Sequence, residues 1–198
     1  MKAKRIALVV PLIFTLGIIA FIGCSNDSLT SPVNQSINQG VPGDQINWIQ
    51  WKPEVANRIK TILDEPRALA KVGYQEKIIY KNEGGTVGGD TTFGCQVTIP
   101  PHAFPEHERT IIVQVATSEE ANAGVDFLPN QTFKKDVKIT VSFEYLNINA
   151  NADLTELNIY WLDDSTGLWV LVPDPEIDLE NGAISVYVDH FTRYGWGL

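Results

Sequence analysis

The stretch Val137-Lys-Ile-Thr-Val-Ser-Phe-Glu-Tyr145 decides the fold class, because apolar and polar side chains alternate along its whole length. Such alternation is typical of a β-strand that buries one face and exposes the other. The apolar positions hold Val, Ile, Phe and Tyr, and the polar positions between them are Lys138, Thr140, Ser142 and Glu144. We therefore expect a half-buried strand here, in a sheet with a packed side and a solvated side.

Shorter patterns of the same kind recur on both sides of this stretch. Strands are expected at residues 77–80, 94–99, 110–116, 157–161, 169–171 and 184–188. Asp163-Asp-Ser-Thr-Gly167 predicts a hairpin, Asn181-Gly182 predicts a turn, and the glycine-rich run 83–89 is expected to end a strand. About seven short strands without an intervening helix indicate an antiparallel β-sandwich or barrel. We expect a mostly β chain whose residues 76–198 form an antiparallel β-sandwich.

One helix is expected before the strands, within residues 46–75. Pro53 and Glu54 suit the first turn of a helix, where a proline loses no hydrogen bond and an acid meets the positive end of the helix dipole. Pro66 would end the helix or begin a second turn. Apolar residues recur at helical spacing and would form one buried stripe, consisting of Val55, Ile59, Ile62 and Leu63.

The charge of the chain limits the classes of partner. The 198 residues carry a formal net charge of −9, and residues 1–23 hold three cations and no acid, so the remainder carries −12. Nucleic acids are bound through cation-rich surfaces. We therefore expect no nucleic-acid partner for this chain.

Residues 1–23 have the composition of a secretory signal peptide. Lys2, Lys4 and Arg5 make a positive start, and residues 6–23 follow without a charge. A positive segment followed by an apolar one is typical of a leader that enters the bilayer and is then removed. The alternative is a permanent transmembrane anchor. An apolar run interrupted by Pro11 and Gly17 is a poor anchor of near-minimal length, which favours the leader.

The leader ends in Phe21-Ile22-Gly23-Cys24, and a polar segment follows. This ending resembles the lipobox of bacterial lipoproteins, in which a small residue precedes the cysteine and a large apolar residue stands three positions before it. The resemblance implies cleavage between Gly23 and Cys24 and lipid, including palmitate, on Cys24. At about 0.8 kcal/mol per buried methylene, two or three acyl chains would hold the chain stably on a membrane. Phe21 departs from the usual leucine.

The expected location is therefore the cell envelope, with the membrane as a partner through the lipid on Cys24. Ser25, directly after the cysteine, resembles the signal for transfer to an outer membrane where the host has one. Residues 24–45 are rich in Ser, Asn, Gln, Pro and Gly, so we expect a flexible tether. Trp48 and Trp51 follow, and we expect them either to pack on the domain edge or to insert into the membrane interface.

Several segments of the β region resemble the ZU-five domain of zona occludens proteins and Unc-five netrin receptors. They are Gly84-Gly-Thr-Val87, Val97-Thr-Ile-Pro-Pro-His-Ala103, Lys134-Lys-Asp-Val-Lys-Ile139, Asn158-Ile-Tyr160, Trp169-Val-Leu171 and Asp189-His-Phe-Thr192 with Tyr194. His102 stands where that family usually has glycine. The resemblance covers residues 84–198 and implies a binding or structural module whose partner is an envelope protein or a glycan, and not an enzyme.

The segment His190-Phe191-Thr192 raises an alternative, because some ZU-five domains cut themselves at a His-Phe-Ser sequence. By that resemblance Thr192 would attack the carbonyl of Phe191 with His190 as base, and water would hydrolyse the ester. Alternate strand positions would place His190 and Thr192 on one face. A cut here releases only residues 192–198, and threonine replaces the family's serine. We therefore expect a structural role for these residues, and self-cleavage stays the alternative.

The remaining candidates favour structure over chemistry. Cys95 alternates with Val97 and Ile99, so we expect a buried thiol and not a reactive one. His102 and His107 lie in a predicted loop with Glu106 and Glu108, but their spacing gives little support for the three or four converging ligands of a metal site. The acids at 163–164 and 174–180 could hold calcium loosely. Ile177 and Leu179 lie between the acids of the second run, so we expect that run to be a solvated edge strand or loop. No metal or cofactor is expected.

Overall fold

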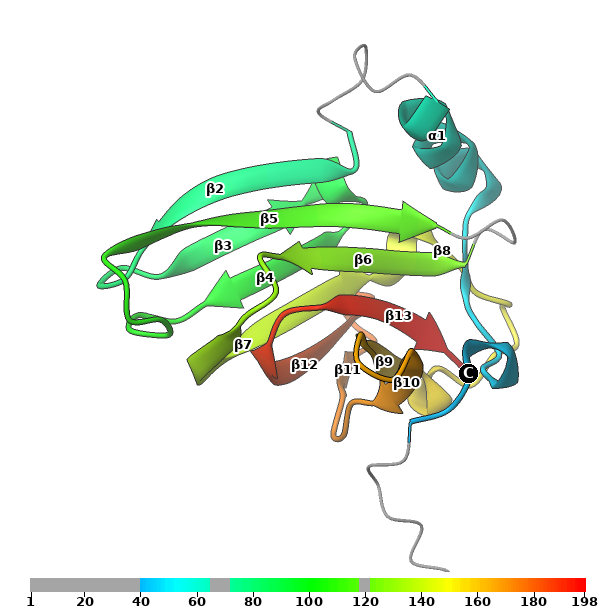
Figure 1. The fold of residues 1–198 in the computed structure, drawn as a ribbon. Helices are drawn as coiled ribbons and strands as arrows, with labels where there is room; N and C mark the ends of the chain where they lie inside the picture. The colour runs from blue at the N-terminus through cyan, green and yellow to red at the C-terminus, as the bar shows by residue number, and fades with distance from the viewer. Residues whose placement is uncertain (1–39, 65–71, 118–121) are drawn as a thin grey trace, which may run out of the picture. The chain divides into compact units, whose positions relative to one another are not determined.

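The computed structural model describes residues 40–64, 72–117 and 122–198. It shows a mostly β protein with antiparallel sheets and one short helix before them (Figure 1). The predicted signal peptide, the lipidation site and residues 24–39 of the predicted tether lie outside the described residues.

The larger sheet has six antiparallel strands in the order β10-β9-β13-β6-β5-β2. Their bounds are β2 Tyr74–Tyr80, β5 Glu108–Thr117, β6 Ala123–Leu128, β9 Asn158–Asp163, β10 Leu168–Leu171 and β13 Arg193–Gly197. β9 and β10 form the predicted hairpin, with Asp163 opposite Leu168. The last strand of the chain, β13, pairs with both β6 and β9, and therefore joins two parts of the sheet.

The second sheet has five antiparallel strands in the order β11-β12-β7-β4-β3. Their bounds are β3 Gly85–Gly89, β4 Cys95–Ile99, β7 Thr132–Ser142, β11 Glu176–Asp178 and β12 Ala183–His190. The alternating stretch from Val137 lies in β7, between β4 and β12. The predicted turn at Asn181-Gly182 joins β11 to β12. β11 lies at the edge of the sheet, which confirms that the acidic run contributes an edge strand.

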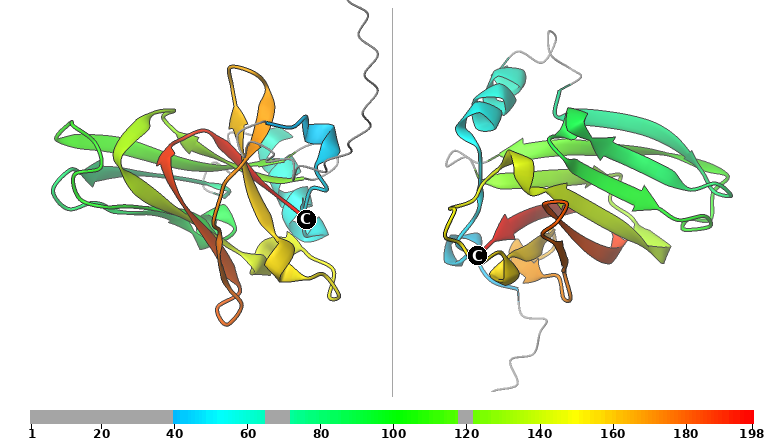
Figure 2. Two further views of the ribbon diagram at one scale, coloured as in Figure 1. Left: turned by 90° about the horizontal axis from the view of Figure 1, so that it is seen from below. Right: turned by 180° about the vertical axis from the view of Figure 1, so that it is seen from behind.

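The two sheets lie one over the other. In Figure 1, β5, β6 and β13 lie in front of β3, β4 and β7, and the rear view of Figure 2 shows the reverse order. One cluster of buried apolar side chains draws on both sheets. Val97, Ile139 and Val186 form a row across three strands of the smaller sheet, and all three side chains are fully buried. The larger sheet faces them with Val113, Val125, Phe127, Tyr194 and Trp196.

The segment before the sheets covers one end of this core. Helix α1 (Pro53–Asp64) begins at Pro53, as predicted, and buries Val55 and Ile59. Before it, β1 (Gln50–Trp51) pairs with β8 (Leu146–Asn147). Trp51 is 1% exposed and donates its indole N–H to the Ala116 carbonyl at 3.0 Å, so this ring is part of the core.

The folded part also includes residues 40–45, which the sequence assigns to the end of the tether. Val41 and Trp169 exchange two backbone hydrogen bonds, of 2.7 and 2.8 Å, so this short segment pairs with the outer edge of β10. Residues 43–45 then form a single 3-10 turn.

The structure departs from the expected strands in three places, although β2 does end at Tyr80, before the glycine-rich run. The glycine-rich run expected to end a strand contains β3, because glycine permits the close approach of β3 to β4: a Cβ on Gly88 would lie 2.2 Å from the Cys95 carbonyl oxygen. The alternating strand ends at Ser142, since residues 143–145 form a 3-10 helix that Ser142 caps. Strands β6 and β13 were not expected, because neither sequence alternates cleanly.

Candidate functional site

Residues 190–192 lie at a corner where the chain passes from one sheet to the other. β12 ends at His190 in the five-stranded sheet, and β13 begins at Arg193 in the six-stranded sheet. The Tyr194 hydroxyl donates a 2.8 Å hydrogen bond to the His190 carbonyl and so ties the corner. A tyrosine bonded to the backbone a few residues upstream is a known corner device of two-sheet β proteins.

The ring of Phe191 fills this corner from inside. It is 2% exposed and lies 4.6 Å from the Phe133 ring and 5.5 Å from the Phe127 ring, measured between ring centroids. Its backbone N–H donates to the Gln131 carbonyl at 2.9 Å. These contacts match the structural role expected for the segment.

The two side chains assigned to self-cleavage have different partners. The Thr192 hydroxyl donates to the Leu162 carbonyl at 2.8 Å, and His190 Nδ1 bonds to the Asp189 carboxylate at 2.8 Å. The His190 ring packs edge-on against Trp161, and its Nε2 is buried without a hydrogen-bond partner among the described residues. The strand ends at His190, so the expected alignment along one continuous strand does not apply. Self-cleavage remains the untested alternative.

Cys95 is a core residue. Its side chain is fully buried in β4, and burial raises the pKa of the thiol far above its ordinary value because the thiolate would lose its hydration. A thiol that stays protonated is neither a nucleophile nor a metal ligand.

The acidic candidates for calcium act as turn formers. Asp163 accepts hydrogen bonds from the hydroxyl and the backbone N–H of Ser165 at 2.6 and 2.9 Å, and these bonds lower its pKa. Asp178 accepts from the side chain and backbone of Asn181, with the same effect on its pKa. Across residues 40–64, 72–117 and 122–198, no group of three acidic, histidine or cysteine side chains is arranged to hold a metal ion.

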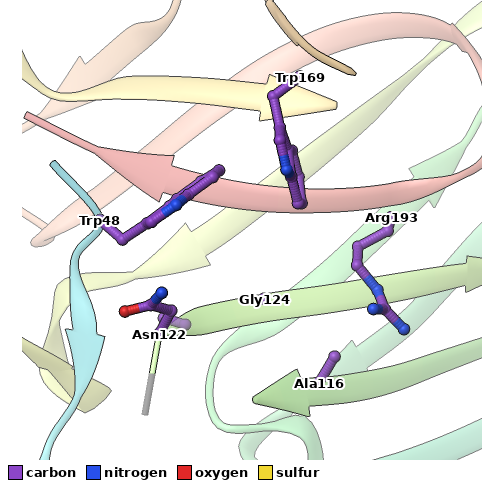
Figure 3. A pocket seen from close by; sticks show the side chains of 7 residues that line it. Trp48, Ala116, Asn122, Gly124, Trp169 and Arg193 are labelled. Atoms are coloured by element: carbon purple, nitrogen blue, oxygen red, sulfur yellow. The ribbon is translucent and has the colours of Figure 1, made fainter. Parts of the chain in front are cut away.

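The outer face of the six-stranded sheet carries an open cleft of about 260 Å³, shown in Figure 3. We call it the tryptophan cleft, and it is lined by Trp48, Ala116, Asn122, Ala123, Gly124, Trp169 and Arg193. These residues come from the segment before β1, from the adjoining ends of β5 and β6, and from β10 and β13. The fold therefore gathers them from four distant parts of the sequence.

The floor of the cleft is a row of small residues. Ala116, Gly124 and Gly195 lie directly opposite one another on the neighbouring strands β5, β6 and β13. A Cβ on Gly195 would lie 2.7 Å from the Trp48 ring, so only glycine lets this ring lie against the strand. The absence of larger side chains in this row creates the hollow.

Two half-buried tryptophans form the walls. The rings of Trp48 and Trp169 meet edge to face, with centroids 4.6 Å apart, and Trp48 also packs edge-on against Tyr160 at 5.8 Å. The indole N–H of Trp48 donates to the Gly43 carbonyl at 2.7 Å, which fixes the orientation of the ring. Of the two locations expected for Trp48, the domain edge is the one observed in the structure.

Arg193 closes one side of the cleft. Its guanidinium makes two hydrogen bonds to Asp126, from Nε at 2.6 Å and from Nη2 at 2.9 Å. The two residues are direct neighbours across β13 and β6, and the hydrogen bonds to Asp126 raise the pKa of the Arg193 guanidinium. A planar group held in this way presents its remaining N–H groups in a fixed direction.

The sequence alone did not identify this cleft. Trp169 lies in a predicted strand and Trp48 precedes the predicted helix, so nothing in their spacing shows that they meet. Arg193 follows the threonine of the corner segment and was not singled out. The one available signal was Trp48, a tryptophan that precedes the predicted helix and lies outside any regular apolar pattern.

No known family model matches this sequence, and no curated protein is significantly similar to it. Within the described part of the chain, no helix has the length and apolar character needed to cross a membrane.

Proposed function

We propose that this chain is an exported lipoprotein of the cell envelope. A signal peptide of residues 1–23 is removed, lipid on Cys24 holds the chain on a membrane, and the following residues connect the lipid to the β domain. In a host with two membranes, Ser25 after the cysteine favours the outer one. The β domain is a binding or structural module.

The observation that carries this proposal is the order of residues at the start of the chain. Cations come first, an uncharged apolar run follows, and Gly23-Cys24 is succeeded at once by a polar segment. A helical membrane anchor of this near-minimal length would be interrupted by Pro11 and Gly17, and it would not need this cysteine. The acidic character of residues 24–198 agrees with a role away from nucleic acids.

We further propose that the two-sheet architecture is a β-sandwich of the ZU-five kind. Two local features support it. His102 has a φ of 66°, a conformation that favours the glycine usual at that position in the family, and the Pro100-Pro101 pair follows the last residue of β4 as the resemblance implies. Circular dichroism and an experimental structure of the full chain would test this architecture.

A binding role accounts for the site better than catalysis does. The hydroxyl of Thr192 and the ring of His190 are engaged with other groups, and the acids at 163 and 178 hold turns. The tryptophan cleft, by contrast, presents aromatic surface and a fixed guanidinium to the outside. Such a surface binds but has no group placed to transfer a proton or attack a bond.

Metabolic labelling with an alkyne analogue of palmitate tests the anchor. We expect the wild-type chain, expressed in a bacterium, to carry the label and to fractionate with membranes. Cys24→Ser should lose the label completely and accumulate with residues 1–23 still attached. The matched control is Cys95→Ala, which removes the other cysteine and should keep the label, since Cys95 is fully buried.

The intact mass of the membrane-extracted chain completes the test. We expect a chain that starts at lipidated Cys24 and ends at Leu198. An unmodified chain that starts at Met1, or a label that persists in Cys24→Ser, would overturn the lipoprotein proposal. Loss of the mass of residues 192–198 would instead establish the self-cleavage alternative.

A further inference from the structure

The tryptophan cleft has the features of a ligand site, and we propose that it binds a single unit of a neutral saccharide chain. This inference deepens the proposed binding role of the β domain and rests on it. It names the class of ligand: sugar rings with free hydroxyls and without charge.

The first argument concerns the walls. Two indole rings, held at 4.6 Å between centroids, present flat π surface over a floor of small residues. The face of an aromatic ring carries partial negative charge and attracts C–H groups. A pyranose ring has a face made mostly of C–H bonds, so it can lie against an indole while its hydroxyls point sideways. Rigid aromatic side chains also lose little entropy when they bind.

The second argument concerns charge, which excludes both kinds of ion. An ammonium ligand would suit aromatic walls, but no carboxylate among the described residues lines the cleft to pair with its charge. An anion would meet a guanidinium already neutralised by Asp126, within a chain that carries a net charge of −12 after residue 23. A neutral polar ligand avoids both penalties.

The third argument concerns hydrogen bonding. Arg193 uses Nε and Nη2 on Asp126, and Nη1 has no partner among the described residues. Its N–H groups are therefore available to donate to a hydroxyl or ring oxygen at the edge of a ring that lies against Trp169. Sugar hydroxyls satisfy such fixed donors, whereas an apolar ligand would leave them unpaired.

The fourth argument concerns size. Pockets that enclose a whole small ligand are about 300–1,000 Å³, and this cleft is smaller and open. It therefore suits one unit of a chain whose other units extend into solvent. A proline-rich peptide would also meet aromatic rings, but it repeats about every 9 Å and docks along successive aromatic slots. Among the described residues that line the cleft, Trp48 and Trp169 are one pair of rings.

Isothermal titration calorimetry on the full chain provides the test, in a detergent that has no sugar headgroup. The neutral probes are cellohexaose, mannohexaose and chitohexaose. Hexagalacturonate serves as the anionic probe and decaproline as the peptide probe. We expect at least one neutral hexasaccharide to bind with a Kd below about 1 mM, and the other two classes to bind at least tenfold more weakly.

Four variants locate the binding. Trp169→Ala should weaken binding at least about tenfold, because it removes one wall, while Trp169→Phe should retain most of it. Arg193→Lys keeps the charge but not the planar fork, and should weaken binding about threefold or more. Tyr187→Ala is the matched control, since it removes an aromatic ring that is 53% exposed on the other sheet, and should leave binding unchanged.

The outcomes separate this inference from the lipoprotein proposal. Cys24→Ser should lose its lipid and still bind the sugar, so either proposal can fail alone. The inference is overturned if no neutral hexasaccharide binds, if only hexagalacturonate or decaproline binds, or if Tyr187→Ala weakens binding as much as Trp169→Ala. If thermal unfolding shows that Trp169→Ala does not fold, the sugar affinities of Trp169→Phe and Arg193→Lys test the inference in its place.

Discussion

The outer faces of the two sheets differ in whether their side chains pair with one another or leave a hollow. On the five-stranded sheet, neighbouring strands place polar groups opposite one another: the Thr140 and Ser185 hydroxyls lie 2.9 Å apart, and Thr86 and Thr98 lie 3.0 Å apart. On the six-stranded sheet, a row of alanine and glycine lies beneath two tryptophans. The first face satisfies its own hydrogen bonds, whereas the second leaves a hollow with aromatic walls.

This difference favours the outer face of the six-stranded sheet as the proposed ligand-binding surface. A face whose polar groups pair among themselves gains little from a ligand, because each new hydrogen bond replaces an existing one. A hollow with half-buried aromatic walls keeps surface that a ligand can cover. The folded segment of residues 40–51 contributes to only one of the two faces, since it pairs with β10 and places Trp48 over β13.

The largest expected effect lies where this segment enters the core. Trp51→Ala should lower the free energy of unfolding by about 3–5 kcal/mol, because a fully buried ring and its hydrogen bond to Ala116 are lost. Urea unfolding measures it. Tyr187→Ala on the other face should change stability by no more than about 0.5 kcal/mol. Similar losses for both variants would show that the segment is not part of the core.

A smaller effect is expected at the floor of the cleft. Gly195→Ala would place a methyl group 2.7 Å from the Trp48 ring, and should cost about 1–3 kcal/mol through displacement of that ring. Gly124→Ala is the control from the same row, because its nearest neighbour atom would lie at 3.3 Å. Urea unfolding measures the stability of both variants. Equal costs would mean that the glycine row does not seat the ring.

The hydroxyl pairs of the five-stranded sheet allow a sharper comparison. Thr140→Val should cost about 1 kcal/mol, since it leaves the buried Ser185 hydroxyl without its partner. Thr86→Val removes a similar pair that is exposed to water, and should be nearly neutral. If the two variants are equally stable in urea, then this face does not depend on its internal pairs.

The smallest effect concerns acid. Hydrogen bonds from Ser165 hold the pKa of Asp163 below its ordinary value. A carboxyl with a lowered folded pKa stabilises the protein above the ordinary pKa, and this contribution is lost as the pH falls through the folded pKa. Asp163→Asn keeps an acceptor for the turn but does not titrate. As the pH is lowered below about 4, the urea midpoint of the variant should therefore decrease less than that of the wild type. If the urea midpoints of the two proteins decrease equally with falling pH, the stabilising role of the Asp163 carboxylate is contradicted.

The sequence predicted the parts of the fold that show regular periodicity. The helix from Pro53, the alternating positions of β7 and the hairpin of β9 and β10 were all expected. Strands β3 and β13 were not, because their glycines are typical of turns, and here they permit close approach of a neighbouring strand or ring. β6 was not expected because its sequence, Ala123-Gly-Val-Asp-Phe-Leu128, does not alternate cleanly between apolar and polar residues.

The site was harder to predict than the fold, for a physical reason. Local patterns identify which side of a strand is buried, but the tryptophan cleft depends on which strands become neighbours. Trp48 and Trp169 meet because Val41 pairs with β10, and Arg193 meets Asp126 because the last strand inserts between β6 and β9. The sequence of the corner at residues 190–192 suggested self-cleavage as an alternative, yet the contacts at this corner mainly hold the two sheets together.

Hydroxyl-radical footprinting of the full chain tests the central claim most directly, because it reports both faces in one experiment. With the tightest-binding neutral hexasaccharide present, mass spectrometry should show reduced oxidation of Trp48 and Trp169 and unchanged oxidation of Tyr187. Protection of Tyr187, or unchanged oxidation of both tryptophans at a saturating sugar concentration, would contradict the assignment of the binding surface to the six-stranded sheet.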